Sequence, residues 1–426
     1  MQSLVKTFFI EYNISMNKRL AFVFNGYELK LEKGEIFFHF GFTGEKNIDF
    51  TERISFPPVN DNIPKALLKS IFDNLMLILG ISYWKLYCPK EIVIESNFLT
   101  EEQAEFWNTV YTKGLGEFFY KNKIDFRGLV KFPFNESAAF VSVNFPRKDR
   151  SLVGIGGGKD SIVSAELLKE SGKQFDLVTS GFPIQIEVAK VIGGKIINVF
   201  RQIDLKLLEL NKEKGVYNGH VPVSVYYAFV LLLAAAVFDY RYVLAGNEKS
   251  ANYGNVEYLG KMINHQWSKS EEFEKLFQEY VGKFITPNIE YSSLLRNMTE
   301  LQVVEKFVKY PKYFKVFSSC NRNFKINPSA LLRTSSKRWC GECPKCLFVF
   351  ISLAAFLPKK QVIDIFDKNL FEEKSLIPIF EELIGIRNFK PFECVGTPEE
   401  VKEALEKIMG KREFNETFLI KHYKAL

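Results

Sequence analysis

The chain has 426 residues, of which 47% are hydrophobic and 25% are charged. At roughly 150 residues per domain this length predicts two or three domains, and the average globular composition excludes a single small module and a wholly disordered chain. The net charge of +7 arises from 57 basic and 50 acidic side chains. This small excess of positive charge argues against a nucleic-acid partner and is typical of a protein that binds small anionic ligands.

The N-terminal residues do not resemble a signal peptide. Residues 1–11 contain one Lys, and no small-residue cleavage site follows an apolar run. The longest apolar run, residues 221–238, contains Pro222 and two Tyr and only just reaches the length of about 18 residues needed to cross a membrane. We therefore expect a cytoplasmic protein without membrane insertion, in which this run is a buried helix.

Short alternating stretches fill residues 8–56. They are separated by Asn25-Gly26 and by Lys33-Gly34, which are typical of hairpin turns. This region is therefore predicted to form an antiparallel sheet.

Two helices are predicted after this sheet. Apolar residues recur at helical spacing over residues 63–79, and a second helical stretch covers residues 100–113. Residues 144–150 contain Pro146 and four consecutive charged residues and are predicted to be a linker. Residues 1–147 therefore form the expected N-terminal α+β domain.

The pattern changes after Arg150 to short apolar strands between helical segments, which favours a parallel α/β sheet. The expected strands are residues 152–155, 175–179, 195–200 and 242–245. Each is followed by a polar or glycine-rich loop, and ligands bind beyond the carboxyl ends of such strands. We predict an α/β domain over residues 148–350, followed by a mainly helical extension over residues 351–426.

The first of these loops is rich in glycine and joins a strand to a helix. Such a turn lets backbone N–H groups approach a phosphate at the helix N-terminus. It is not a Walker A loop, because Asp160 follows Lys159 and Val153 stands five residues before Gly158; it also lacks the third glycine of a dinucleotide fingerprint. The alternative is a structural turn without a ligand.

The segment Gly-Gly-Gly-Lys-Asp-Ser resembles the Ser-Gly-Gly-x-Asp-Ser loop of the PP-loop ATP pyrophosphatase superfamily. The resemblance implies an adenine nucleotide α-hydrolase-like domain that cleaves ATP to AMP and pyrophosphate, with Gly in place of the first Ser. The implied ATP-binding residues are Gly156, Gly157, Gly158, Lys159, Asp160 and Ser161. Lys159 would offset phosphate charge, Ser161 would donate a hydrogen bond, and Asp160 would bind Mg²⁺.

Four of the six cysteines lie close together in the sequence. They are Cys320, Cys340, Cys343 and Cys346. Four thiolates suit a structural, tetrahedral Zn²⁺ site, and some PP-loop enzymes carry a similar group. An iron–sulfur cluster and a set of buried free thiols are the alternatives.

Three polar segments, residues 218–223, 246–255 and 264–270, are expected to contact the substrate as a group. In the last segment His265 and Lys269 are expected to lie one helical turn apart. The side chains in and near these segments that can transfer a proton are Glu248, His265, Lys269, His220 and Cys394. For each one alone a structural role is the simpler interpretation.

Segments along nearly the whole chain resemble the family of UDP-N-acetylmuramoyl-L-alanyl-L-glutamate epimerases. They are residues 80–85, 114–118, 218–223, 247–255, 264–270, 339–350 and 390–397. The resemblance implies ATP- and Mg²⁺-dependent inversion of the terminal L-glutamate of a UDP-muramoyl dipeptide, through an acyl-adenylate, in peptidoglycan precursor synthesis.

Two other functions fit the loop. One is a PP-loop enzyme that forms an amide, a nitrile or a thio group on a modified nucleobase or another carboxylate. The other is a non-catalytic nucleotide-binding protein, against which the presence of Asp160 and Ser161 argues. The sequence leaves the proton-transferring base and the oligomeric state open.

Overall fold

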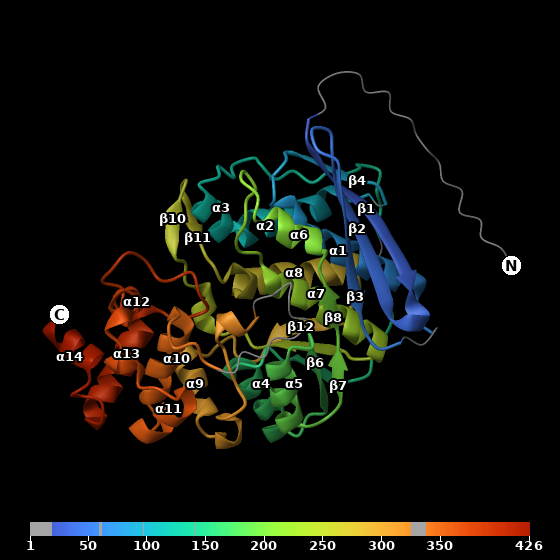
Figure 1. The fold of residues 1–426 in the computed structure, drawn as a ribbon. Helices are drawn as coiled ribbons and strands as arrows, with labels where there is room; N and C mark the ends of the chain where they lie inside the picture. The colour runs from blue at the N-terminus through green and yellow to red at the C-terminus, as the bar shows by residue number, and fades with distance from the viewer. Residues whose placement is uncertain (1–18, 59–61, 97, 141, 325–337) are drawn as a thin grey trace.

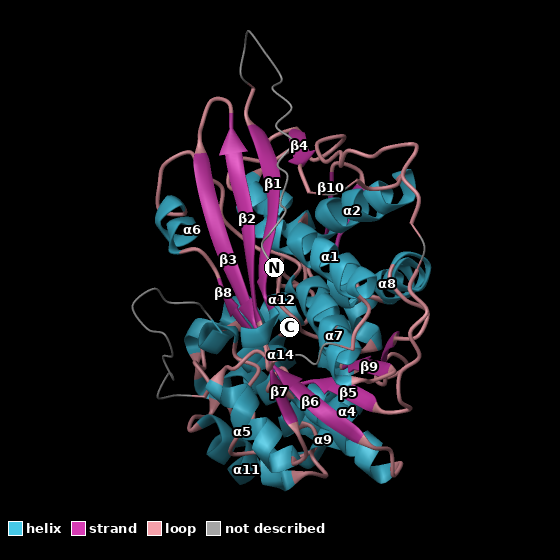
Figure 2. Ribbon diagram, turned by 90° about the vertical axis from the view of Figure 1, so that its right-hand side faces the viewer, coloured by secondary structure: helices cyan, strands magenta, loops and turns pink. Residues whose placement is uncertain are grey.

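Two five-stranded sheets organise the chain, one in each half of the view in Figure 2. The computed structural model describes residues 19–58, 62–96, 98–140, 142–324 and 338–426. Residues 1–11 and the first part of the predicted N-terminal sheet lie outside the described residues.

The first sheet has the strand order β4-β1-β2-β3-β8. Its strands are β1 (Ala21–Lys30), β2 (Glu35–Thr43), β3 (Ile48–Ser55), β4 (Glu91–Ile94) and β8 (Phe200–Gln202). Neighbouring strands are antiparallel, as expected, except that β4 runs parallel to β1. Alternate residues of β1 and β2 bury a row of aromatic rings, among them Phe22, Phe24, Phe38, Phe40 and Phe42.

The turn predictions in this sheet have different outcomes. A turn does join β1 to β2, where Gly34 has a left-handed φ of 64°. The turn predicted at Asn25-Gly26 is wrong, because β1 continues through both residues to Lys30 with a register shift between Phe24 and Gly26. An Asn-Gly pair can also produce a bulge, which bends the strand without ending it.

Helices pack behind this sheet and lead to the second one. They are α1 (Lys65–Trp84), α2 (Glu101–Gly114), α3 (Gly116–Asn122), α7 (Val223–Phe238) and α8 (Glu271–Phe284). The predicted helices over residues 63–79, 100–113 and 221–238 correspond to α1, α2 and α7. Among the described residues only α1 is long and apolar enough to cross a membrane, but 89% of its most apolar window is buried inside the protein. That burial is typical of a core helix.

The second sheet has the order β12-β9-β5-β6-β7, and all its neighbouring strands are parallel. Its strands are β5 (Ser151–Gly154), β6 (Phe175–Thr179), β7 (Ile196–Asn198), β9 (Tyr242–Ala245) and β12 (Glu290–Ser293). In Figure 2, α7 lies above this sheet, and α4 (Lys159–Glu170) and α5 (Pro183–Ile192) lie below it. The parallel α/β sheet was therefore predicted correctly.

One predicted strand was assigned too much length. Residues 195–200 do not form a single strand, because β7 ends at Asn198 and Phe200 begins β8, which pairs with β3 of the other sheet. Because β8 joins the first sheet and α1 packs on α7, the two halves share one hydrophobic core across the predicted linker.

The C-terminal region is helical, as predicted, and lies at the lower left of Figure 1. It comprises α10 (Pro344–Ala354), α11 (Lys359–Phe366), α12 (Ile377–Leu383), α13 (Pro398–Lys411) and α14 (Phe418–Ala425). The segment between α12 and α13, residues 384–397, has no helix. Helix α10 also contacts α9 (Glu300–Phe307), which brings this region to the second sheet.

Candidate active site

A cavity of about 270 Å³ lies at the carboxyl edge of the parallel sheet. It is lined by the ends of β5 and β9, between which the strand order reverses, and ligands of parallel sheets bind at such a switch point. Each of the four predicted strands is followed by a loop that was expected to contact a ligand, and residues from three of these loops, 156–161, 180–181 and 246–255, line the cavity. The fourth loop, residues 201–204, is not among the described residues that line the cavity. Its first two residues belong to β8, which pairs with β3 of the other sheet.

The glycine loop leads from β5 into α4 and faces this cavity. Gly157 has a φ of +86°, which a residue with a side chain rarely adopts, and its carbonyl accepts a hydrogen bond from the N–H of Ser318 at 3.0 Å. Helix α4 begins at Lys159, so the backbone of the cavity-lining residues Gly156, Gly158 and Asp160 lies at a helix N-terminus. This is the geometry of a phosphate-binding turn.

Three carboxylates from separate segments meet beside the loop. Oxygens of Asp160, Glu248 and Glu300 lie within 4.8 Å of one another. Glu300 is the first residue of α9, and its N–H donates to Ser250 Oγ at 3.1 Å. Glu248 Oε1 is buried and accepts no hydrogen bond from any residue that the structure describes. Burial and the neighbouring carboxylates raise the pKa of Glu248 to about 7.

Three lysines supply positive charge near the carboxylates. Lys159 is fully buried and forms ion pairs with Asp160 and Glu300, so it neutralises the acidic group and is not among the described residues that line the cavity. Burial opposes its charge, but the two carboxylates raise its pKa above the ordinary range. Lys269 and Lys345 do line the cavity, and Lys345 Nζ lies 3.5 Å from Glu300.

A thiol and two imidazoles form a second cluster. Cys394 lines the cavity, and its Sγ lies 3.9 Å from His265 Nε2. The other ring nitrogen of His265 forms a hydrogen bond with Glu117, whose Oε2 also lies 3.4 Å from His220 Nδ1. Four of the candidates for proton transfer, Cys394, His265, His220 and Lys269, are thus neighbours. Residues 264–270 are not an α-helix, because they form a loop and a single 3-10 turn at Trp267–Lys269.

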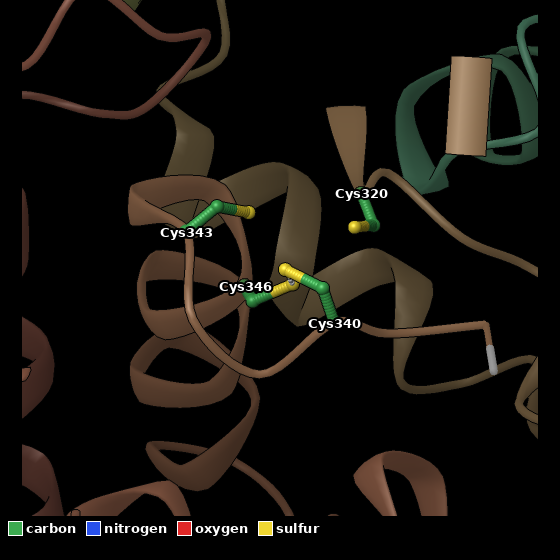
Figure 3. A group of neighbouring side chains, drawn as sticks. All are labelled: Cys320, Cys340, Cys343 and Cys346. Carbon is green, nitrogen blue, oxygen red and sulfur yellow. Dashed lines mark hydrogen bonds between the residues drawn. The ribbon is translucent and has the colours of Figure 1, made fainter. Parts of the chain in front are cut away.

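The four clustered cysteines are also brought together, at the N-terminus of α10 (Figure 3). Their sulfur atoms lie within 4.8 Å of one another, and Cys340 Sγ is 3.6 Å from Cys346 Sγ. A tetrahedral zinc site with bonds of about 2.3 Å separates its sulfurs by roughly 3.8 Å. The arrangement therefore fits a structural Zn²⁺, which would fix Lys345 between Cys343 and Cys346.

The chain matches two family domains that together cover most of its length. Residues 14–294 match the MurL N-terminal domain, and residues 316–426 match the MurL C-terminal domain. The chain belongs to the MurL family.

Three relatives carry the name UDP-N-acetyl-alpha-D-muramoyl-L-alanyl-L-glutamate epimerase. The protein from Xanthomonas oryzae pv. oryzae is 38% identical over 350 residues, which cover 82% of this chain and 76% of the relative. That from Micromonospora is 34% identical over 92% of this chain and 88% of its own length. That from Salinispora tropica is 35% identical over 94% and 87% of the two chains.

Three residues of this MurL-family site were not predicted from the sequence. Glu300 and Glu117 meet their partners Lys159 and His265 across 141 and 148 residues of sequence, so no local spacing shows the pairing. Lys345 could have been found from the sequence, because it lies between Cys343 and Cys346. A metal bound by the cysteines would also fix the position of Lys345.

Proposed function

We propose that the protein inverts the terminal L-glutamate of UDP-N-acetylmuramoyl-L-alanyl-L-glutamate to D-glutamate in an ATP-dependent reaction of peptidoglycan precursor synthesis. The names of relatives that match most of the chain support this substrate. The observation that carries the proposal is that one cavity is lined both by a phosphate-binding turn and by a group able to exchange a proton, Cys394.

The glycine loop is the proposed site for the phosphates of ATP. Gly156, Gly158 and Ser161 line the cavity, and the N-terminus of α4 adds a favourable dipole for an anion. Lys269 and Lys345 also line the cavity and supply positive charge. These features support the PP-loop interpretation, in which ATP is cleaved between its α- and β-phosphates.

Asp160, Glu248 and Glu300 are the residues that would bind Mg²⁺. Carboxylate oxygens are the ligands that this ion prefers, and the buried, unpartnered Oε1 of Glu248 supplies a free donor atom. The ion would offset the charge of the phosphates. Lys159 stabilises this group of carboxylates, since its ion pairs reduce the repulsion between Asp160 and Glu300.

Activation of the substrate explains why an epimerase needs ATP. The α-hydrogen beside an ionised carboxylate is very hard to remove, because the carbanion would add a second negative charge. Adenylylation converts the carboxylate to a neutral mixed anhydride, so that loss of the α-proton gives an enolate that donors at the site can stabilise. Reprotonation from the other face followed by hydrolysis releases the D-glutamyl product, AMP and pyrophosphate. We place this reaction in the cytoplasm, where ATP is available.

The nucleotide products test this proposal. With the UDP-muramoyl dipeptide, ATP and Mg²⁺, chromatography should show AMP and pyrophosphate, whereas ADP as the main product would contradict it. Asp160→Asn should abolish AMP formation. The matched control is Asp125→Asn, which removes an exposed carboxylate that pairs with Arg127 and should leave the rate unchanged.

A further inference from the structure

Cys394 is the side chain best placed for proton transfer. Of the five candidates predicted from the sequence, only Cys394 and Lys269 are among the described residues that line the cavity. Lys269 stays protonated and cannot accept a proton, because the charge of Cys394 outweighs burial and raises the pKa of its ammonium group above the ordinary range. Cys394 is therefore the one candidate that reaches the cavity and can accept a proton.

The neighbours of Cys394 fix its position. Lys345 Nζ donates a hydrogen bond to the backbone carbonyl of Cys394, and the next residue, Val395, is fully buried. Gln266 Nε2 donates to the carbonyl of Val395 at 3.3 Å. The thiol therefore lies at a fixed point in the cavity wall.

A line of polar groups leads away from the sulfur. His265 Nε2 lies 3.9 Å from the sulfur, and the hydrogen bond from His265 Nδ1 to Glu117 fixes the orientation of the ring. The rings of His265 and His220 lie 4.5 Å apart, and His220 also contacts Glu117. Glu117 thus joins two imidazoles, of which the His265 ring faces the thiol.

The electrostatics favour a thiolate at this point. Burial opposes ionisation of Cys394, but Lys269 and the His265 imidazolium lower the pKa of the thiol to about 5. The hydrogen bonds to Cys394 and Glu117 outweigh burial and raise the pKa of His265 to about 9. The charged groups that face the sulfur are Lys269, His265, Lys345, Lys390 and Glu393.

We propose that Cys394 is the catalytic residue that exchanges the α-proton of the activated glutamate, and that His265 and Glu117 are positioning residues that hold it as a thiolate. This inference rests on the proposed function, and it assigns Cys394 to one face of the α-carbon of the glutamate.

The proton-transfer step balances without a further reactant. The Cys394 sulfur takes the α-proton, an S–H bond forms as the C–H bond breaks, and the electron pair passes to the acyl oxygen to give the enolate. A proton from water adds to the opposite face of the α-carbon. The thiol, whose pKa is about 5, then loses its proton to solvent and neutralises the hydroxide left by the water, so one proton leaves and one enters in each inversion.

Deuterium exchange tests the catalytic role. In D₂O, Cys394→Ser and Cys394→Ala should lower deuterium incorporation at the α-carbon at least 100-fold, in the range of lost acid–base catalysis. Both variants should still form AMP, and hydroxylamine should still trap the acyl-adenylate. The matched control is Cys88→Ser, whose buried thiol contacts the carbonyl of Lys85 and is not among the described cavity residues.

The outcomes separate this inference from the function on which it rests. If the wild-type enzyme forms no AMP with the dipeptide, the proposed function fails. If the wild type inverts glutamate and Cys394→Ser does so within about threefold of its rate, the assignment of Cys394 is overturned while the function stands. Loss of both AMP formation and exchange in a folded Cys394→Ala variant would also overturn it, since the residue would then serve binding.

Titration of the thiolate tests the positioning residues independently of activity. The difference in absorbance at 240 nm between wild type and Cys394→Ser removes the signal of the other cysteines. Its midpoint should lie near pH 5 and should rise by more than one pH unit in His265→Gln and in Glu117→Gln. The matched control is His422→Gln, because His422 pairs with Glu381 in a similar way. A wild-type thiol that is still protonated at pH 7 would overturn the proposal.

Discussion

Replacement of Gly157 by Ala should destabilise the protein and disrupt the phosphate-binding turn. The left-handed φ of +86° costs a residue with a side chain about 1–2 kcal/mol. The added Cβ would lie 2.8 Å from Ile184 Cγ2, and relief of such an overlap in a packed region typically costs about 1–3 kcal/mol. We therefore expect the free energy of unfolding to fall by about 2–5 kcal/mol.

The neighbouring glycine provides the matched control. A Cβ at Gly156 would meet no described atom within 4 Å, and its φ is not left-handed, so Gly156→Ala should change the free energy of unfolding by less than about 1 kcal/mol. Urea unfolding followed by tryptophan fluorescence compares the two variants. Folded Gly157→Ala protein should also fail to form AMP. The backbone movement that relieves the overlap would displace the Gly157 carbonyl, which accepts the hydrogen bond from Ser318. Equal stability of the two variants would refute this reasoning.

Three further predictions concern the metal ions and the buried ion pair. The purified protein should contain about one zinc per chain, and Cys343→Ser should lower the zinc content and the melting temperature more than the rate at permissive temperature. Glu300→Gln should raise the Mg²⁺ concentration for half-maximal AMP formation at least tenfold, whereas Glu290→Gln should not. The pair of Glu117 and His265 should stabilise the fold most between about pH 4.5 and pH 6.5. At Glu117 burial is outweighed by the hydrogen bond and charge of His265, which lower the pKa to about 2, and at His265 it is outweighed by the hydrogen bonds to Cys394 and Glu117, which raise the pKa to about 9.

Each of these has a direct check. Elemental analysis that finds neither zinc nor iron would reject a metal at the cysteines. An unchanged Mg²⁺ requirement in Glu300→Gln would remove that carboxylate from the ion's ligands. The stability difference between wild type and Glu117→Gln, measured by urea unfolding, should shrink as the pH rises from 6.5 through 9 and the imidazolium loses its proton; a difference that grows over this range would contradict the pairing.

The sequence predicted those strands whose signal is local and apolar. The limits of β9, Tyr242–Ala245, agree with the prediction, because this strand is a continuous apolar run between Arg241 and Gly246, as is typical of a buried parallel strand. Strand β12 was missed, because in Glu290–Ser293 only Tyr291 is apolar and its pairing with β9 depends on residues about 50 positions away. Phe200 was placed in the wrong sheet for the same reason.

The candidate site shows the same division. The glycine loop and the cysteine group are contiguous motifs and were located from spacing alone. The contacts of Lys159 with Glu300 and of His265 with Glu117 join distant segments, so the sequence identified one member of each pair. Lys159 was predicted to face phosphate and instead lies among the carboxylates, because full burial of a lysine requires acidic partners.

Chiral analysis of the glutamate tests the central claim most directly. UDP-N-acetylmuramoyl-L-alanyl-L-glutamate is incubated with the enzyme and Mg²⁺ in D₂O, with and without ATP, and the glutamate is released by acid hydrolysis. The proposed reaction predicts D-glutamate with deuterium at the α-carbon and one AMP for each inversion, and only unlabelled L-glutamate without ATP. L-glutamate with intact ATP, or inversion that proceeds without ATP, would contradict it.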